Sequence, residues 1–133
     1  MAVVLDSSAI LADLFMEPGA ELVRGLRGNP LASAVNVAEV HAKLLDRSRL
    51  SPSPESAKQE IRELEGGWRF QTIDFDAEQA LKSGELRPVT RHLGLSLGDR
   101  ACLALALVRK LPVLTADRSW LGLDIGVEIR SIR

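Results

Sequence analysis

Hydrophobic positions along the chain switch repeatedly between short continuous runs and a helical spacing. The first run, "VVL" at residues 3–5, is wholly apolar, which is typical of a strand buried on both faces. Apolar side chains then recur every three or four positions and predict a helix over residues 7–15. The chain therefore begins with a strand that leads directly into a helix.

The same alternation continues through the rest of the chain. Further strands are predicted at "LASAV" (31–35), "WRFQTIDF" (68–75), "PVLT" (112–115) and "GVEIRSI" (126–132). Further helices are predicted over 20–27, from Asn36 onward, over 54–67, over 77–93 with a break near Pro88, and over 96–110. The last helix is apolar on nearly every side and should be central, whereas "SPSPES" (51–56) is the expected loop.

This order of elements predicts an α/β fold. Strands alternate with helices five times, which indicates a mostly parallel sheet flanked by helices through right-handed crossovers. The length of 133 residues suits one domain covering residues 1–133. In such sheets ligands bind beyond the carboxyl ends of the strands, where the strand order reverses. The pattern itself does not determine the strand order.

Four acidic residues occupy comparable places in this predicted fold. Asp6 follows the first strand and Asp117 follows "PVLTA", so both should lie just past strand ends. Glu39 and Asp99 are each expected in the first turn of a helix that follows a loop. In a parallel sheet all four side chains can face one crevice at the carboxyl edge.

Each acid also has a purely structural explanation. Asn36–Glu39 and Ser96–Asp99 have the spacing of a capping box, and Asp6 and Asp117 can serve as caps or turn formers. These alternatives stay open for each acid taken singly. Taken together, two carboxylates about 4 Å apart repel by about 4 kcal/mol at an effective dielectric near 20, whereas a cap contributes about 1 kcal/mol. Four carboxylates in one crevice therefore indicate a bound cation, and oxygen ligands without His or Cys favour Mg²⁺ or Mn²⁺.

The overall composition narrows the partners and the compartment. Seventeen basic side chains nearly balance eighteen acidic ones, so no global charge directs the chain to nucleic acid or to a membrane. Cys102 is the only cysteine, which excludes an internal disulfide and suggests a buried thiol in a reducing compartment. Neither a signal peptide nor a membrane-spanning segment is evident, so we expect a soluble cytoplasmic protein.

Four blocks of the sequence resemble the signature motifs of PIN-domain ribonucleases. They are "VVLDSSAIL", "NVAEV", "SLGDRACLALAL" and "VLTADRSW", and they occur in this order from residue 3 onward. The short chain and "TADRSW" are similar to the VapC toxins of type II toxin–antitoxin systems. The resemblance implies a PIN-like three-layer sandwich whose five-stranded sheet has the order 3-2-1-4-5. In that order the strands that carry Asp6 and Asp117 lie side by side.

The resemblance also implies roles for individual residues. The acidic cluster that binds Mg²⁺ or Mn²⁺ would comprise Asp6, Glu39, Asp99 and Asp117. Ser7 and Thr115 match small hydroxyl residues that would orient carboxylates or water, although a helix cap or a strand-end hydroxyl explains either one equally well. Arg100 and Arg118 adjoin two of the acids and would reach phosphates or hold carboxylates, with solvated surface charge as the alternative.

The implied reaction is endonucleolytic cleavage of RNA, in which a metal-activated water attacks phosphorus and the 3′ oxygen leaves. The implied partners are the RNA substrate, a cognate VapB-like antitoxin and a second copy in a homodimer. The apolar faces of the first three helices, Leu22 included, are expected to be mostly core, with part of the first two available to an amphipathic antitoxin segment. Residues 50–95 carry no signature.

Two other functions compete with this one. A PIN-like domain could bind RNA or protein without catalysis, and the four intact acids count against lost activity. A receiver-like phosphoacceptor domain also places acids near strand ends, but it requires an acidic pair after the first strand and a Lys after the last crossover. Here serines follow Asp6, and Lys110 precedes its strand.

Overall fold

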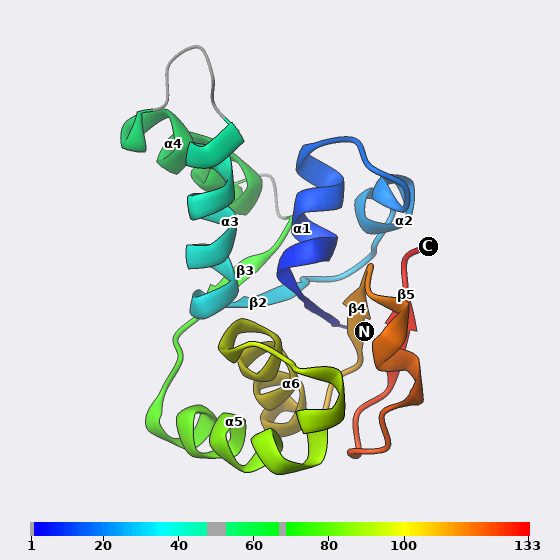
Figure 1. The fold of residues 1–133 in the computed structure, drawn as a ribbon. Helices are drawn as coiled ribbons and strands as arrows, with labels where there is room; N and C mark the ends of the chain where they lie inside the picture. The colour runs from blue at the N-terminus through cyan, green and yellow to red at the C-terminus, as the bar shows by residue number, and fades with distance from the viewer. Residues whose placement is uncertain (1, 48–52, 67–68) are drawn as a thin grey trace.

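The computed structural model describes residues 2–47, 53–66 and 69–133. In these residues five strands form one sheet that is flanked by six α-helices (Figure 1). Trp68, Gly67 and the first two residues of the expected loop at 51–56 lie outside the described residues. No helix in the described part is long and apolar enough to cross a membrane.

Each predicted strand and helix is present. The strands are β1 (Val4–Leu5), β2 (Leu31–Ser33), β3 (Gln71–Ile73), β4 (Val113–Thr115) and β5 (Ile129–Ser131). The helices are α1 (Ser7–Leu14), α2 (Ala20–Arg24), α3 (Ala34–Arg47), α4 (Pro54–Gly66), α5 (Ala77–Thr90) and α6 (Leu97–Arg109), with short 3-10 helices η1 (Arg91–Leu93) and η2 (Arg118–Gly122). The strands are shorter than predicted, most clearly β3.

The strand order is β3-β2-β1-β4-β5, and every neighbouring pair is parallel. This confirms the order that the family resemblance implied. It also rules out the receiver-like alternative, because receiver domains have the order 2-1-3-4-5. The chain moves outward from β1 to β3 and then returns to β4 on the other side of β1. The topological switch point therefore lies between the carboxyl ends of β1 and β4.

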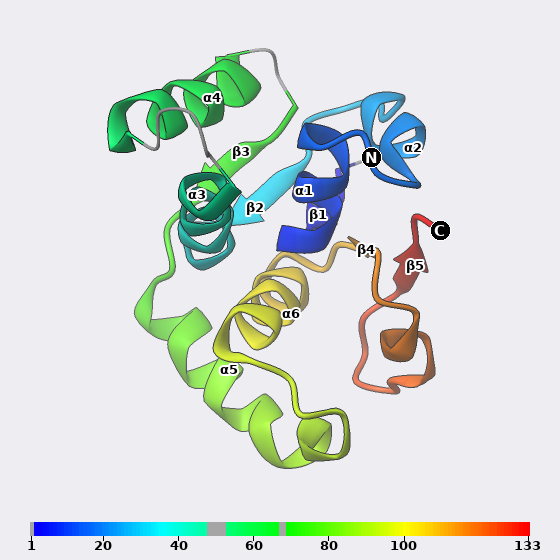
Figure 2. The same ribbon diagram turned by 45° about the horizontal axis from the view of Figure 1, so that its top comes forward.

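Alternate residues of the central strands face two separate cores. Leu5 and Leu114 pack with side chains of α1 to α4, whereas Val4 and Val113 pack with side chains of α5, α6 and η2. Figure 2 shows these two groups of helices on opposite sides of the sheet. Because both faces are covered, the central strands are continuous apolar runs, and the predicted three-layer sandwich is confirmed. As predicted, α6 is central, and Cys102 within it is fully buried.

Helix α5 corrects one prediction, because it continues through Pro88 to Thr90. Proline removes the hydrogen bond to the carbonyl four residues earlier, here that of Gly84. Both residues are exposed, so water can reach that carbonyl. Thr90 Oγ1 also donates to the Leu86 carbonyl at 2.7 Å within the last turn.

Helix α3 corrects a second prediction, because it begins at Ala34, directly after β2. Ser33 Oγ accepts a hydrogen bond from the Val35 N–H at 3.2 Å and so satisfies one of the free donors of the first turn. Asn36 therefore lies inside the first turn and Glu39 in the second, so the predicted Asn36–Glu39 capping box is not formed.

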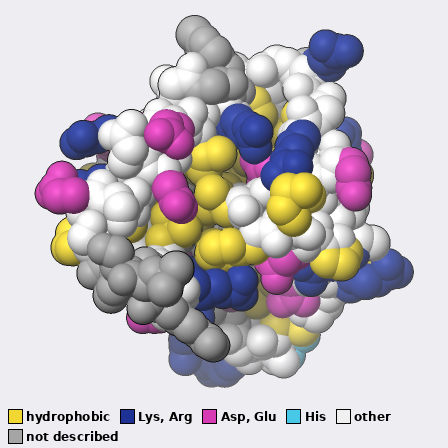
Figure 3. Space-filling model, turned by 90° about the horizontal axis from the view of Figure 1, so that it is seen from above, with side chains coloured by type: hydrophobic (Ala, Val, Ile, Leu, Met, Phe, Trp, Pro, Cys, Tyr) yellow, Lys and Arg dark blue, Asp and Glu magenta, His cyan; other side chains and the backbone are white. Residues whose placement is uncertain are grey.

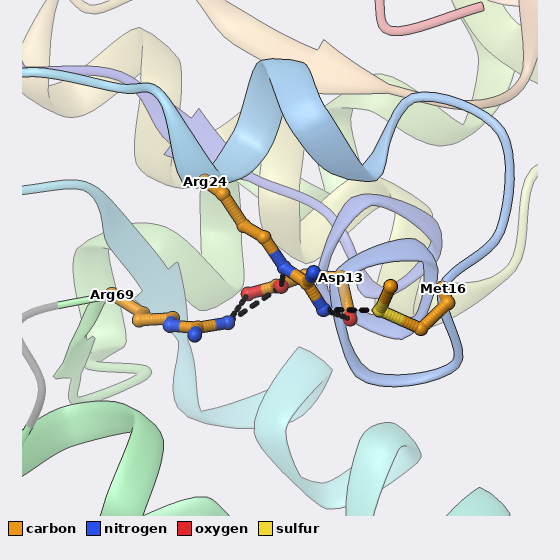
Figure 4. A network of polar contacts seen from close by, with 4 residues as sticks. All are labelled: Asp13, Met16, Arg24 and Arg69. Atoms are coloured by element: carbon orange, nitrogen blue, oxygen red, sulfur yellow. Dashed lines mark hydrogen bonds and ion pairs between the residues drawn. The ribbon is translucent and has the colours of Figure 1, made fainter.

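A buried carboxylate ties α1 and α2 to the residues before β3. Asp13 is only 3% exposed, and its Oδ1 accepts hydrogen bonds from Arg24 Nε and Arg69 Nη1, each at 2.6 Å (Figure 4). Arg69 Nη1 also lies 2.7 Å from Asp13 Oδ2, and Arg24 Nη2 donates to the Asp13 carbonyl at 2.8 Å. A carboxylate this deeply buried requires such partners, so the cluster joins segments that are far apart in sequence.

Replacing Asp13 with Asn should lower the free energy of unfolding by about 2 kcal/mol, because two guanidinium groups lose their charged acceptor. Urea unfolding followed by circular dichroism measures this change. Asp124→Asn, at an exposed position, is the matched control and should stay within about 0.5 kcal/mol of the parent. Equal losses in the two variants would contradict the structural role of Asp13.

Candidate functional site

Asp6 lies at the topological switch point, where it ends β1 and begins α1. Its N–H donates to the Leu114 carbonyl at 3.2 Å, which continues the pairing of β1 with β4. Its Oδ1 accepts hydrogen bonds from the Ala9 N–H at 2.8 Å and from Ser8 Oγ at 2.7 Å. Asp6 is 3% exposed, so the predicted helix cap is formed by a deeply buried carboxylate.

Two hydroxyl groups fasten the end of β4 to Asp6. Thr115 Oγ1 donates to Asp6 Oδ2 at 2.5 Å and accepts from the Asp117 N–H at 3.0 Å. Ser8 Oγ accepts from the Ala116 N–H at 2.8 Å. Thr115 therefore contacts the Asp6 carboxylate, and its role in orienting a metal ligand stays a prediction. Sequence analysis assigned no role to Ser8, although the "DSS" run showed a second hydroxyl beside Asp6.

Asp117 and Asp99 both act as caps. Asp117 is exposed, and its Oδ1 accepts from the Ser119 N–H at 2.9 Å and from Ser119 Oγ at 2.6 Å at the start of η2. Asp99 Oδ2 accepts from the Ser96 N–H at 3.0 Å, and the Asp99 N–H donates to Ser96 Oγ at 3.2 Å. The predicted capping box at the start of α6 is therefore confirmed.

Glu39 reaches the same edge of the sheet from the second turn of α3. Its Oε1 accepts hydrogen bonds from Ser7 Oγ at 2.5 Å and from Asn36 Nδ2 at 3.0 Å. Ser7 therefore contacts the Glu39 carboxylate, and its role in orienting a metal ligand stays a prediction. Sequence analysis treated Asn36 only as a cap and missed this contact, because it placed the start of α3 two residues too late.

The charges of the four acids act on one another. Burial raises the pKa of Asp6 to about 6, against the hydrogen bonds from Thr115 and Ser8, and the charge of Asp99 raises it further. Burial also raises the pKa of Asp99, to which the charges of Glu39 and Asp117 add. Asp99 is thus the acid whose charge is coupled to each of the other three.

The pKa of the buried Cys102 thiol responds to the same group of acids. Burial raises its pKa well above the ordinary value, and the charges of Asp6, Asp99 and Glu39 raise it further. Asp6, Glu39 and Asp99 are thus near enough to this buried atom of α6 for their charges to affect its pKa.

The donor chemistry of these acids fits a divalent cation. Glu39, Asp99 and Asp117 each use one carboxylate oxygen for local hydrogen bonds, and the other oxygen accepts none from the described residues. Within the described part of the chain no Lys or Arg forms an ion pair with any of the four acids. Oxygen donors with uncompensated negative charge suit Mg²⁺ or Mn²⁺.

The four side chains are not arranged as a closed coordination shell. Across residues 2–47, 53–66 and 69–133, no group of three or more His, Cys, Asp or Glu side chains is placed to hold a metal ion. Each carboxylate instead accepts hydrogen bonds from nearby hydroxyl, amide or backbone groups. The structure thus brings the four predicted acids to one edge of the sheet without closing them around a common point.

The two arginines beside the acids point elsewhere. Arg100 Nη1 donates to the Ser83 carbonyl in α5 at 3.1 Å, and Arg118 Nη1 donates to the Arg133 carbonyl at 3.0 Å. The suggestion that they hold carboxylates is therefore wrong, because their side chains connect α6 to α5 and η2 to the last residue.

In the metal-free protein, stability should fall as pH rises from about 4 to 6. The pKa of the Asp6 carboxyl rises from 3.8 to about 6 on folding. As pH rises, the unfolded chain therefore loses the Asp6 proton before the native protein does, and this stabilises the unfolded chain relative to the native protein. At about 1.36 kcal/mol per pH unit the loss is about 3 kcal/mol, complete above the folded pKa. Urea unfolding at four pH values with a chelator measures it. Asp6→Asn should abolish most of this dependence and Asp124→Asn should keep it; an unchanged slope in Asp6→Asn contradicts the explanation.

Comparisons with known proteins agree with this architecture. The PIN domain family model matches residues 3–125. VapBC2 from Rickettsia felis, solved bound to a DNA fragment from its promoter, contains a chain that is 16% identical, with a TM-score of 0.72 and coverage of 98% of each chain. A DNA-bound VapBC from Salmonella typhimurium is 20% identical, with a TM-score of 0.69 and coverage of 100% of this chain and 99% of that chain.

A third similar structure is a member of the VapBC family of toxin–antitoxin systems from Mycobacterium tuberculosis. It is 24% identical, with a TM-score of 0.62 and coverage of 99% of this chain and 98% of that chain. No curated protein shows a significant match to the sequence. At these identities the solved structures show a shared fold, whereas the family match spans nearly the whole chain. The chain belongs to the PIN-domain family.

Proposed function

We propose that this chain is a Mg²⁺- or Mn²⁺-dependent endoribonuclease that serves as the toxin of a toxin–antitoxin pair. The observation that carries the proposal is the placement of Asp6 between the ends of β1 and β4 and of Glu39 against Gly98, beside Asp99, in a PIN domain. No described Lys or Arg forms an ion pair with these acids, and a bound cation would supply the missing positive charge.

The residues that would hold the ion are Asp6, Glu39, Asp99 and Asp117. A bound divalent ion would lower the pKa of a water molecule and offset the charge of the phosphodiester. The protein contributes fixed carboxylates: Thr115 and Ser8 orient Asp6, and Ser7 orients Glu39. The reaction is hydrolysis of RNA, in which the oxygen of water bonds to phosphorus and the bond to the 3′ oxygen breaks.

Asp6→Asn and Asp99→Asn should each lower the rate of RNA cleavage by at least about hundredfold, because removing one charged ligand weakens transition-state stabilisation by several kcal/mol. Initial rates on end-labelled RNA, with Mg²⁺ or Mn²⁺ and with excess chelator, measure this. Chelator should abolish cleavage by the parent. Asp124→Asn is the control and should cleave like the parent, and circular dichroism verifies folding. Parental cleavage by Asp99→Asn contradicts the proposed site.

The proposed partner is a VapB-like antitoxin whose amphipathic segment packs on α1 and α2. Figure 3 shows apolar side chains gathered on this end of the molecule, with both Lys and Arg and Asp and Glu side chains around them. Leu22 and Met16 are 45% and 69% exposed, so the prediction that Leu22 belongs to the core is wrong. A hollow of about 170 Å³ adjoins α1, and its lining residues are Phe15, Leu44, Arg47, Ser56, Ala57 and Glu60. The solved structures of similar fold include toxin–antitoxin complexes, which supports this partner.

The assembly and the compartment complete the proposal. We place residues 1–133 in one PIN domain, since the family match spans residues 3–125. The resemblance to VapC toxins supports a homodimer that acts on RNA in the cytoplasm. Size-exclusion chromatography with light scattering reports the oligomeric state directly.

Leu22→Asp should weaken antitoxin binding by at least about tenfold, because a charge replaces an exposed apolar side chain of α2 on the proposed face. Binding is measured by calorimetry with a purified VapB-like antitoxin. Leu81→Asp is the matched control, since Leu81 is 72% exposed on α5 on the other side of the sheet. Unchanged affinity in Leu22→Asp, with the fold retained, counts against this docking face.

A further inference from the structure

We propose that Asn36 is a positioning residue, which holds the Glu39 carboxylate against the first turn of α6 in the orientation that a cation requires. The inference rests on the proposed function, because the orientation of Glu39 matters for activity only if the four acids bind an ion. The sequence motifs gave no indication that Asn36 positions Glu39.

The Asn36 amide nitrogen joins three helices at one buried point. Nδ2 lies 3.0 Å from Glu39 Oε1, 3.0 Å from Ser7 Oγ in α1 and 3.1 Å from the Gly98 carbonyl in α6. Asn36 is 1% exposed. These contacts therefore form away from bulk water, where a hydrogen bond to a charged group is strong.

The contacts determine which way the amide faces. Glu39 Oε1 and the Gly98 carbonyl are acceptors only, so the nitrogen and not the oxygen must point toward them. Asn36 Oδ1 is then left without a hydrogen-bond partner among the described residues. A buried amide oxygen in this state costs about 1–3 kcal/mol. The fold accepts this cost. This indicates that Asn is needed here for the two N–H donors of its amide group and not for the shape of its side chain.

Gly98 provides the space into which Glu39 is held. A Cβ atom at Gly98 would come closer than 3.0 Å to three atoms of the Glu39 carboxylate group. The carboxylate thus occupies the volume that any larger residue would fill, directly beside Asp99. Asn36 binds the Gly98 carbonyl and Glu39 Oε1 together, and Glu39 Oε2 accepts no hydrogen bond from the described residues. One oxygen is fixed and the other remains for a ligand.

A double-mutant cycle tests whether Asn36 acts through Glu39. The affinity for Mn²⁺ alone is measured by calorimetry for the parent, Asn36→Ala, Glu39→Gln and the double variant. Second-layer partners of metal ligands contribute about tenfold to hundredfold in affinity, so Asn36→Ala should weaken Mn²⁺ binding by that factor. With Glu39→Gln already present, the same change should weaken binding by less than about twofold.

A second variant and a matched control separate positioning from general loss of packing. Asn36→Ser makes a smaller change and takes the place of Asn36→Ala if that variant does not fold. It should likewise weaken Mn²⁺ binding. Gln79→Ala removes another buried amide whose oxygen also lacks a described partner, at the opposite end of α6 beside Val108 and Arg109. This control should lose stability but keep parental Mn²⁺ affinity.

Three outcomes overturn the inference. Equal loss of Mn²⁺ affinity in the parental and Glu39→Gln backgrounds shows that Asn36 acts by general packing. Parental affinity in both folded Asn36 variants, in a protein that binds Mn²⁺ and cleaves RNA, overturns the positioning role alone. No Mn²⁺ binding and no cleavage by the parent overturns the proposed function together with it.

Discussion

The burial of the Asp6 carboxylate between the ends of β1 and β4 is the constraint on which the rest of the site depends. A charge that is 3% exposed must be compensated, and here the compensation comes from two hydroxyls and a backbone N–H. Thr115 supplies one hydroxyl from β4 and Ser8 the other from α1. The side chain that begins α1 is therefore also the one that holds β1, β4 and the following loop together.

Two buried carboxylates of this protein are balanced in different ways. Asp13 faces two guanidinium groups, which neutralise it and tie α1 to α2 and to Arg69, two residues before β3 (Figure 4). Asp6 and its neighbouring acids have hydroxyl and amide partners but form no ion pair within the described residues. The first arrangement is complete by itself and explains stability. The second retains negative charge, which is the property that a cation site requires.

The structural and the functional explanations of the acids turn out to be compatible. Asp99 forms its capping box and Asp117 caps η2, yet each does so with a single carboxylate oxygen. Glu39 is held by one oxygen in the same way. A cap determines the direction of the side chain and leaves the second oxygen for another ligand. Local hydrogen bonding therefore orients these acids and does not compete with the proposed cation.

The sequence by itself determined the order of the elements and singled out the four acids as candidates, because both depend on local patterns. Continuous apolar runs indicated strands covered on two faces, and the acids followed directly from the ends of those runs. The strand order came from the motif resemblance rather than from the pattern. Two predictions from local rules were wrong. The break expected near Pro88 is absent, because Pro88 lies on an exposed side of α5. Helix α3, expected from Asn36, begins earlier, because Ser33 caps its first turn.

Only the tertiary structure decided how the side chains around the acids are used. Asn36 donates to Gly98, which is 62 positions away, and Thr115 donates to Asp6 across 109 positions. Whether Arg100 faces the acids or α5 likewise depends on where α5 packs. Such contacts have no local signature, because the spacing between the partners is set by crossovers of variable length. The sequence therefore identified the charged groups, and the packing of α1, α3, α6 and β4 determined their orientation.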